Sequence, residues 1–243
     1  MVKIIMMKLL ILIFYTFILR ANTIQQVLQQ QQGSTVDSNI FPIFPLQFTA
    51  TLKITSNLID ENNDYPPRYR QITIYYDYIN KKARADIEAG YEAAKIYIRR
   101  YDKKNEYMIR LPPINDCKRA YLGEVMPFPD IPDSKFIGIE VINDIECNYF
   151  IFNEYETRIH IYMNKYDNSP VRLIQEDIVD QLSIPVLTYD YSDIELGPPD
   201  ESWFDLTSLS SSSISSSSYE HKSCVKHSGG FPYLHIFHYF IRF

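Results

Sequence analysis

Histidine and cysteine side chains gather near the C-terminus in a pattern that could bind a metal ion. They are His221, Cys224, His227, His235 and His238. Thiolate and imidazole groups are ligands that zinc prefers, and four of them can surround one tetrahedral ion. However, the spacing matches no standard zinc finger, and His235 and His238 would point to opposite faces of a strand. We therefore predict no metal site and no cofactor.

Acidic residues raise the second chemical possibility, because Asp190, Asp193 and Glu195 could supply a carboxylate pair for acid–base catalysis. Carboxylates in strands and turns are usually solvated instead. The sequence contains no Gly-x-Ser-x-Gly, no glycine-rich phosphate loop and no His-Glu-x-x-His. No cysteine has the neighbours of a cysteine-protease nucleophile. We predict that the protein is not an enzyme.

The N-terminal residues Met1 to Ala21 have the features of a signal peptide. Lys3 and Lys8 supply a positive segment before an apolar run, Leu9 to Leu19, that is short for a membrane span. Arg20 interrupts the expected cleavage region, so an uncleaved signal anchor is the alternative. No later stretch approaches the roughly 20 apolar residues of a membrane-spanning helix. We expect the mature chain to be secreted, extracellular or in the endolysosomal lumen, with no transmembrane span.

Three cysteines fit such an oxidising compartment. Cys117 and Cys147 lie in the regularly patterned part of the chain, whereas Cys224 follows a serine tract. The economical pairing is a Cys117–Cys147 disulfide with Cys224 free. The alternative is that all three thiols are unpaired.

Charge excludes one class of partner. Without Lys3, Lys8 and Arg20 the chain keeps 21 basic and 30 acidic residues, a net charge of −9. Neutralising nucleic-acid phosphates requires clustered Lys and Arg. We therefore expect no nucleic-acid partner.

Regular alternation of apolar and polar residues predicts β-strands. Over the stretch Leu46 to Thr55, the apolar residues Leu46, Phe48, Ala50, Leu52 and Ile54 alternate with polar ones, the period of a strand with one buried face. Similar stretches, separated by turn residues, cover 69–79, 83–88, 95–100, 106–111, 136–142, 147–152, 158–163, 170–174 and 189–195. Leu173 to Leu182 is the best helix candidate, and no crossover helices connect the strands. The pattern predicts an all-β, antiparallel meander with at most one short helix.

Composition divides the chain into five parts. After the signal peptide (1–21) come a glutamine-rich linker (22–40) and the β domain (41–206). A serine-rich linker (207–218) follows, which cannot offset the entropy of ordering. The last part (219–243) is an aromatic tail that must add a strand or contact something else.

Residues in the second half of the β domain resemble a known family. Gly138 to Asn143, followed by Cys147 and Tyr149, is similar to a segment of LolA-like domains, which precede the papain-like part of some cysteine proteases such as counting factor-associated protein D. Pro170 to Arg172, Tyr189 to Tyr191, Gly197 to Asp200 and Phe204 fit the same family. Asp144 and Tyr149 depart from the family's usual glycine and tryptophan, and this sequence includes no protease domain. The resemblance implies a curved half-barrel over a hydrophobic cavity, and hence a lipid-like ligand.

Two functions follow as hypotheses. The first is a carrier of a lipid-like or other apolar ligand, with candidate cavity residues Phe48, Leu52, Ile72, Ile74 and Tyr76, although these side chains could simply fill the core. The second is an extracellular protein-interaction module, favoured by the many tyrosines and the aromatic tail. A roomy apolar cavity would favour the carrier, and a filled core would favour the module.

Overall fold

The computed structural model describes residues 41–58, 69–88, 93–131, 133–179, 182–206 and 224–231. The chain divides into two compact units, residues 1–40 and 41–243, and every described residue belongs to the second. The predicted signal peptide, glutamine-rich linker and serine-rich linker therefore lie outside the described residues. In the described ranges, no helix is long and apolar enough to cross a membrane.

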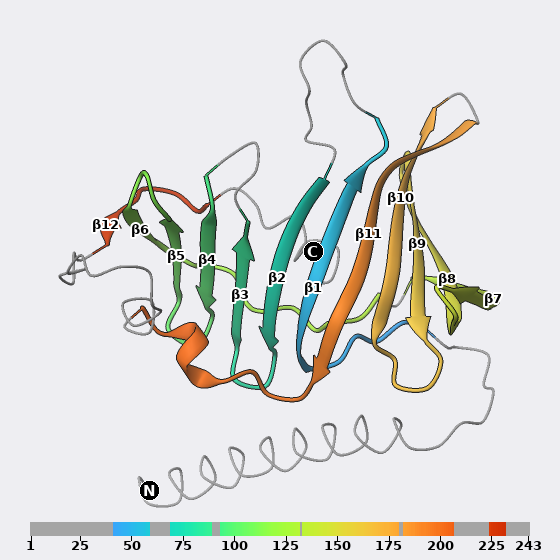
Figure 1. Ribbon diagram of the computed structural model, residues 1–243, viewed down its shortest axis with the longest axis horizontal. Coiled ribbons are helices and arrows are strands. Elements are labelled where there is room, and N and C mark those ends of the chain that lie inside the picture. The colour runs from blue at the N-terminus through green and yellow to red at the C-terminus, as the bar shows by residue number, and fades with distance from the viewer. Residues whose placement is uncertain are drawn as a thin grey trace, which may run out of the picture. The chain divides into compact units, whose positions relative to one another are not determined.

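The described residues form one open sheet of twelve strands (Figure 1). The strand β1 (Gln47–Ser56) lies near its middle, paired with β2 on one side and β11 on the other. The other elements are β2 (Tyr69–Asp77), β3 (Lys82–Ile87), β4 (Lys95–Arg100), β5 (Asn105–Arg110), β6 (Asp116–Tyr121), β7 (Lys135–Ile142), β8 (Ile145–Glu154), β9 (Thr157–Asn164), β10 (Pro170–Val179), β11 (Leu182–Leu196), the 3₁₀ turn η1 (Glu201–Phe204) and β12 (Val225–Lys226). Strands β2 to β6 form one meander and β7 to β11 a second. All pairings are antiparallel except that of β12 with β6, so the predicted all-β antiparallel fold is confirmed.

The alternation in β1 explains which face of the sheet is buried. Phe48, Ala50, Leu52 and Ile54 are all buried, and in the register with β2 the first three lie opposite Tyr76, Ile74 and Ile72. We call this the core face. Because side chains of a strand alternate between faces, Thr49, Thr51 and Lys53 project from the opposite, outer face.

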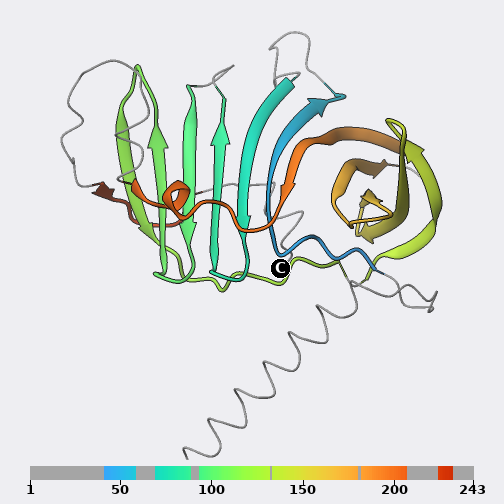
Figure 2. The same cartoon turned by 60° about the horizontal axis from the view of Figure 1, so that its bottom comes forward.

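The sheet bends toward its core face. Side chains from β1, β2 and β3 belong to the same buried cluster as Phe150, Ile161 and Leu173 from β8, β9 and β10. Figure 2 shows the sheet curling over at the end that carries β7 to β10. The predicted curved sheet is confirmed, and it is open rather than closed into a barrel.

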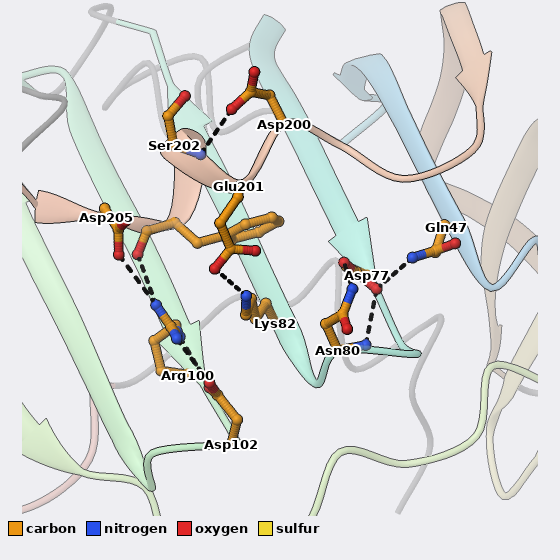
Figure 3. A network of polar contacts seen from close by, with 11 residues as sticks. Gln47, Asp77, Asn80, Lys82, Arg100, Asp102, Asp200, Glu201, Ser202 and Asp205 are labelled. Atoms are coloured by element: carbon orange, nitrogen blue, oxygen red, sulfur yellow. Dashed lines mark hydrogen bonds and ion pairs between the residues drawn. The ribbon is translucent and has the colours of Figure 1, made fainter.

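A strap crosses the outer face of β2 to β4 after β11 ends; it consists of residues 197–206 and includes η1. Arg84 donates a hydrogen bond to the Trp203 carbonyl at 2.7 Å, and the Trp203 ring stacks on Tyr75 with centroids 4.8 Å apart. Lys82 pairs with Glu201, as Figure 3 shows. Asp200 caps η1 by accepting a hydrogen bond from the Ser202 N–H at 2.8 Å. These contacts fix the strap to the sheet.

Acid is expected to weaken the part of this network that surrounds Arg100 (Figure 3). The Arg100 guanidinium donates two hydrogen bonds to Asp102, at 2.9 and 2.7 Å. Burial alone would raise the pKa of the Asp102 carboxyl, but the Arg100 contacts outweigh it and hold that pKa below its usual value. A carboxyl whose pKa is lower in the folded state stabilises the fold above its unfolded pKa of about 4, and this contribution is lost as the pH falls through the folded-state pKa.

As the pH falls from about 4 to about 2, the free energy of unfolding should decrease in the wild type. We expect a smaller decrease in Asp102→Asn, which lacks this carboxyl. Urea unfolding followed at several pH values measures both curves. Parallel curves for the two proteins would contradict this role of Asp102.

Two sequence predictions of elements were wrong. The helix candidate Leu173 to Leu182 belongs instead to strands β10 and β11, where Leu173 is buried opposite Tyr189 in the core. The strand β6 was missed, because Asp116 to Tyr121 is mostly polar and lacks a clean alternation. The two strands differ in position: β10 lies between two long strands and buries Leu173, whereas β6 lies next to the edge strand β12 and buries only Ala120.

Candidate functional site

The five residues proposed to line a cavity lie together on the core face of β1 and β2. They are Phe48, Leu52, Ile72, Ile74 and Tyr76, and their exposed fractions are between 0 and 4%. Phe48 and Tyr76 are directly opposite in the ladder, with ring centroids 5.5 Å apart. Burial raises the pKa of the Tyr76 phenol, which therefore stays protonated at neutral pH. The structure thus brings all five together, as a contiguous apolar surface.

Other parts of the chain cover that surface. Phe44, Met126 and Ile131 are buried in the same cluster as the five residues. Their two segments are joined by backbone hydrogen bonds, from the Phe44 N–H to the Pro129 carbonyl at 2.8 Å and from the Ile131 N–H to the Pro42 carbonyl at 3.1 Å. Packing from the cover and from β8 to β10 accounts for the low exposure of the five side chains. Their geometry is that of a hydrophobic core.

A row of polar side chains on β8, β9 and β10 has the composition of an acid–base site. The Tyr149 hydroxyl lies 2.6 Å from His160 Nδ1, and His160 Nε2 lies 2.9 Å from Glu176 Oε2. Tyr149 stacks on Tyr162 with centroids 4.8 Å apart, and both rings are buried. Burial raises the pKa of both phenols, so neither is a base at neutral pH. The row is packed within the sheet and holds three strands together.

The acidic residues singled out in the sequence do not form a carboxylate pair of their own. Asp190 is held by Arg172, whose Nε lies 2.5 Å from Asp190 Oδ1. Asp193 has a left-handed backbone conformation, with φ of 51°, and Glu195 lies opposite Thr49 in the ladder with β1.

The predicted disulfide was wrong. Cys117 is bonded to Cys224, with Cα atoms 4.6 Å apart, and Cys147 is a buried free thiol. A disulfide requires Cα atoms about 4.4 to 6.8 Å apart. The strands β6 and β8, which carry Cys117 and Cys147, lie near opposite ends of the sheet. Instead, the C-terminal segment that carries Cys224 returns to β6.

This disulfide also bears on the histidine and cysteine group near the C-terminus. Because Cys224 is bonded to Cys117, its thiolate is not available as a metal ligand. His227 stacks on Phe231, whereas His221, His235 and His238 lie outside the described residues. Within the part of the chain that the structure describes, no three His, Cys, Asp or Glu side chains are grouped to hold a metal ion.

One edge of the sheet is covered. The backbone edge of β6 that points away from β5 pairs with β12, and the His227 N–H donates to the Arg119 carbonyl at 2.8 Å. The Cys117–Cys224 bond fixes this pairing, and the Phe231 N–H donates to Glu106 Oε1 at 2.8 Å. Such covers are a common protection of sheet edges, which otherwise present unpaired backbone groups.

Strand β7, at the other edge, has no such cover among the residues that the structure describes. It is the last strand of the sheet and pairs only with β8 among the described strands. Its apolar side chains are exposed: 46% for Ile137, 52% for Ile139 and 65% for Val141. An exposed apolar edge is a template for pairing with another chain. The sequence predicted this strand, but its mainly apolar composition is equally typical of a buried strand, so the edge position was missed.

Comparisons with known proteins address the fold. A scan against models of protein families finds no match, and no curated protein matches in sequence. An uncharacterized conserved protein from Thermus thermophilus is similar in structure, with a TM-score of 0.51 and 10% identity over 75% of this chain and 91% of that one. This likeness shows the fold alone.

Two further solved structures are more distant. MucB in complex with MucA(peri) has a TM-score of 0.41 and 9% identity, over 65% of this chain and 53% of that one. A LolA superfamily protein from Nitrosomonas europaea has a TM-score of 0.32 and 13% identity, over 69% of this chain and 93% of that one. Both scores are too low to support an argument about function.

Proposed function

We propose that this chain is a secreted, non-enzymatic domain of LolA-like type that binds an extended segment of another protein along strand β7. The observation that carries the proposal is the exposure of Ile137, Ile139 and Val141 on a sheet edge with which no further described strand pairs. A peptide that adds a strand gains backbone hydrogen bonds from the edge and specificity from alternate side chains.

The contrast between the two edges supports this site. At the β6 edge, β12 and the Cys117–Cys224 bond cover the outer strand. At the β7 edge, the side chains exposed beside the unpaired backbone are mainly apolar. Four of the six exposed side chains of β7 are apolar, and an exposed apolar edge strand is a template for pairing with another chain, so this edge favours a binding role.

The core supports a binding module over a carrier. Phe48, Leu52 and Tyr76 are packed beneath Phe44, Met126 and Ile131. The lipid carrier predicted from the family resemblance is therefore the second hypothesis. A lipid found by native mass spectrometry on the gently purified full chain would favour that carrier over the module.

The secreted location has two supports. Residues Met1 to Ala21 have the composition of a signal peptide, and the chain contains a Cys117–Cys224 bond. Structural disulfides persist mainly in oxidising compartments.

A peptide selection tests the binding site. Random twelve-residue peptides displayed on phage are selected on the immobilised full chain, and the enriched peptides are titrated against variants. We expect alternating apolar residues in the enriched peptides, and Ile139→Lys to weaken their binding at least about tenfold, because a charge on an edge strand opposes pairing.

The matched control is Val225→Lys, which places the same charge on an exposed apolar residue of β12, at the covered edge. Its affinity for the peptides should equal that of the wild type. Peptides that bind Ile139→Lys as tightly as the wild type would contradict β7 as the site.

A further inference from the structure

A β-bulge in β7 decides which of its side chains share a face. The register with β8 shifts between Phe136 and Gly138, which leaves Ile137 as the extra residue. Lys135 and Glu140 lie opposite Ile151 and Cys147, which are four residues apart in β8 and so on one face. Without the bulge, residues five apart such as Lys135 and Glu140 would lie on opposite faces.

The same shift aligns two apolar residues. Phe136 and Ile139 lie opposite Phe150 and Asn148, two residues apart in β8, and so share the other face. The six residues from Lys135 to Glu140 therefore have one charge at each end, of opposite sign and on one face. Between these two charges, the apolar residues Phe136 and Ile139 occupy the other face of the strand. Such an arrangement is complementary to itself when the strand runs antiparallel to a copy.

We propose that β7 pairs edge to edge with β7 of a second copy of this chain, which sets Lys135 opposite Glu140 of the other copy. This inference rests on the proposed function, since it names the partner strand at the same edge. A two-fold axis perpendicular to the sheet passes between Ile137 and Gly138. It preserves the faces, so Phe136 meets Ile139 of the other copy and the Lys–Glu contact forms twice.

Charges around the edge agree with this pairing. Lys135 and Glu140 are exposed, and neither has an ion-pair partner among the residues that the structure describes. Opposite charges facing each other across antiparallel strands are stabilising, and like charges are destabilising. The contact is also closed: each copy uses the same strand, so pairing stops at a dimer.

Charge reversal in the full chain tests the register. Sedimentation velocity measures the dimer dissociation constant over concentrations up to about 100 µM, where small interfaces associate. We expect Lys135→Glu and Glu140→Lys each to raise that constant on the order of tenfold, because each replaces two attractive contacts with two repulsive ones. The double variant restores both pairs and should return to about the wild-type value. Lys103→Glu, in the exposed turn between β4 and β5, makes the same charge change and should have no effect.

The outcomes separate this inference from the proposed function. A wild type that stays monomeric throughout, or a double variant that is no better than the single ones, overturns the pairing of two copies. If peptide binding is nevertheless lost in Ile139→Lys, the edge binds a different protein and only the inference fails. If that peptide binding is also unaffected, the proposed function fails as well.

Discussion

Replacing Leu52 by alanine is expected to lower the free energy of unfolding by about 2 to 5 kcal/mol. Leu52 is fully buried at the centre of β1, between Ile72 of β2 and Tyr191 of β11. Deleting its side chain removes apolar contacts and leaves a cavity that the surrounding strands cannot fill. Urea unfolding of the wild type and the variant, followed by tyrosine and tryptophan fluorescence, measures the difference.

The size of this loss distinguishes a core from a ligand-binding cavity. The control is Ile139→Ala in β7, which truncates an exposed strand residue and should cost less than about 1 kcal/mol. A side chain that lines an open cavity leaves no new void when it is shortened. If Leu52→Ala lowered the free energy of unfolding by less than about 1 kcal/mol, the result would contradict a filled core and favour the lipid carrier over the binding module.

Local pattern was sufficient to predict most strands. The alternation around Phe48 and Leu52 predicted β1, because a strand with one buried face has a period of two. The turn at Asn143-Asp144 was also predicted; both residues adopt left-handed backbone angles, with φ of 50° and 64°. Asn and Asp tolerate such angles in two-residue hairpin turns. Predictions of this kind depend only on neighbours in the sequence.

Features that depend on the order of strands could not be predicted. Cys117 and Cys147 both lie in the regularly patterned part of the chain, which suggested that they pair. Their strands, β6 and β8, lie nine positions apart in the sheet order. Nothing local indicates that Cys224, 107 residues from Cys117, returns to β6. The same limit applies to the candidate site: the run Phe136 to Ile142 suits a buried or an edge strand, and only the topology places it at the edge.

Replacing Cys224 by serine is expected to cost about 2 to 5 kcal/mol of unfolding free energy. The Cys117–Cys224 bond closes a loop with a sequence separation of 107 residues. Linking positions so distant restricts the unfolded chain strongly. In the folded state, the bond holds a pairing of only two residues, Val225 and Lys226, to β6. Denaturant unfolding of the oxidised full chain measures the loss.

Three comparisons test whether the loss comes from this bond. Cys117→Ser should cost about as much as Cys224→Ser, and the double variant about as much as either, because each removes the same bond. Cys147→Ala should cost less than about 1.5 kcal/mol, since its thiol is free and the change removes one buried atom. If Cys147→Ala matched Cys117→Ser while Cys224→Ser was neutral, the bond would join Cys117 to Cys147 instead. The covered β6 edge would then be held by hydrogen bonds without a covalent link. The contrast between the two edges, on which the binding site at β7 rests, would be much weaker.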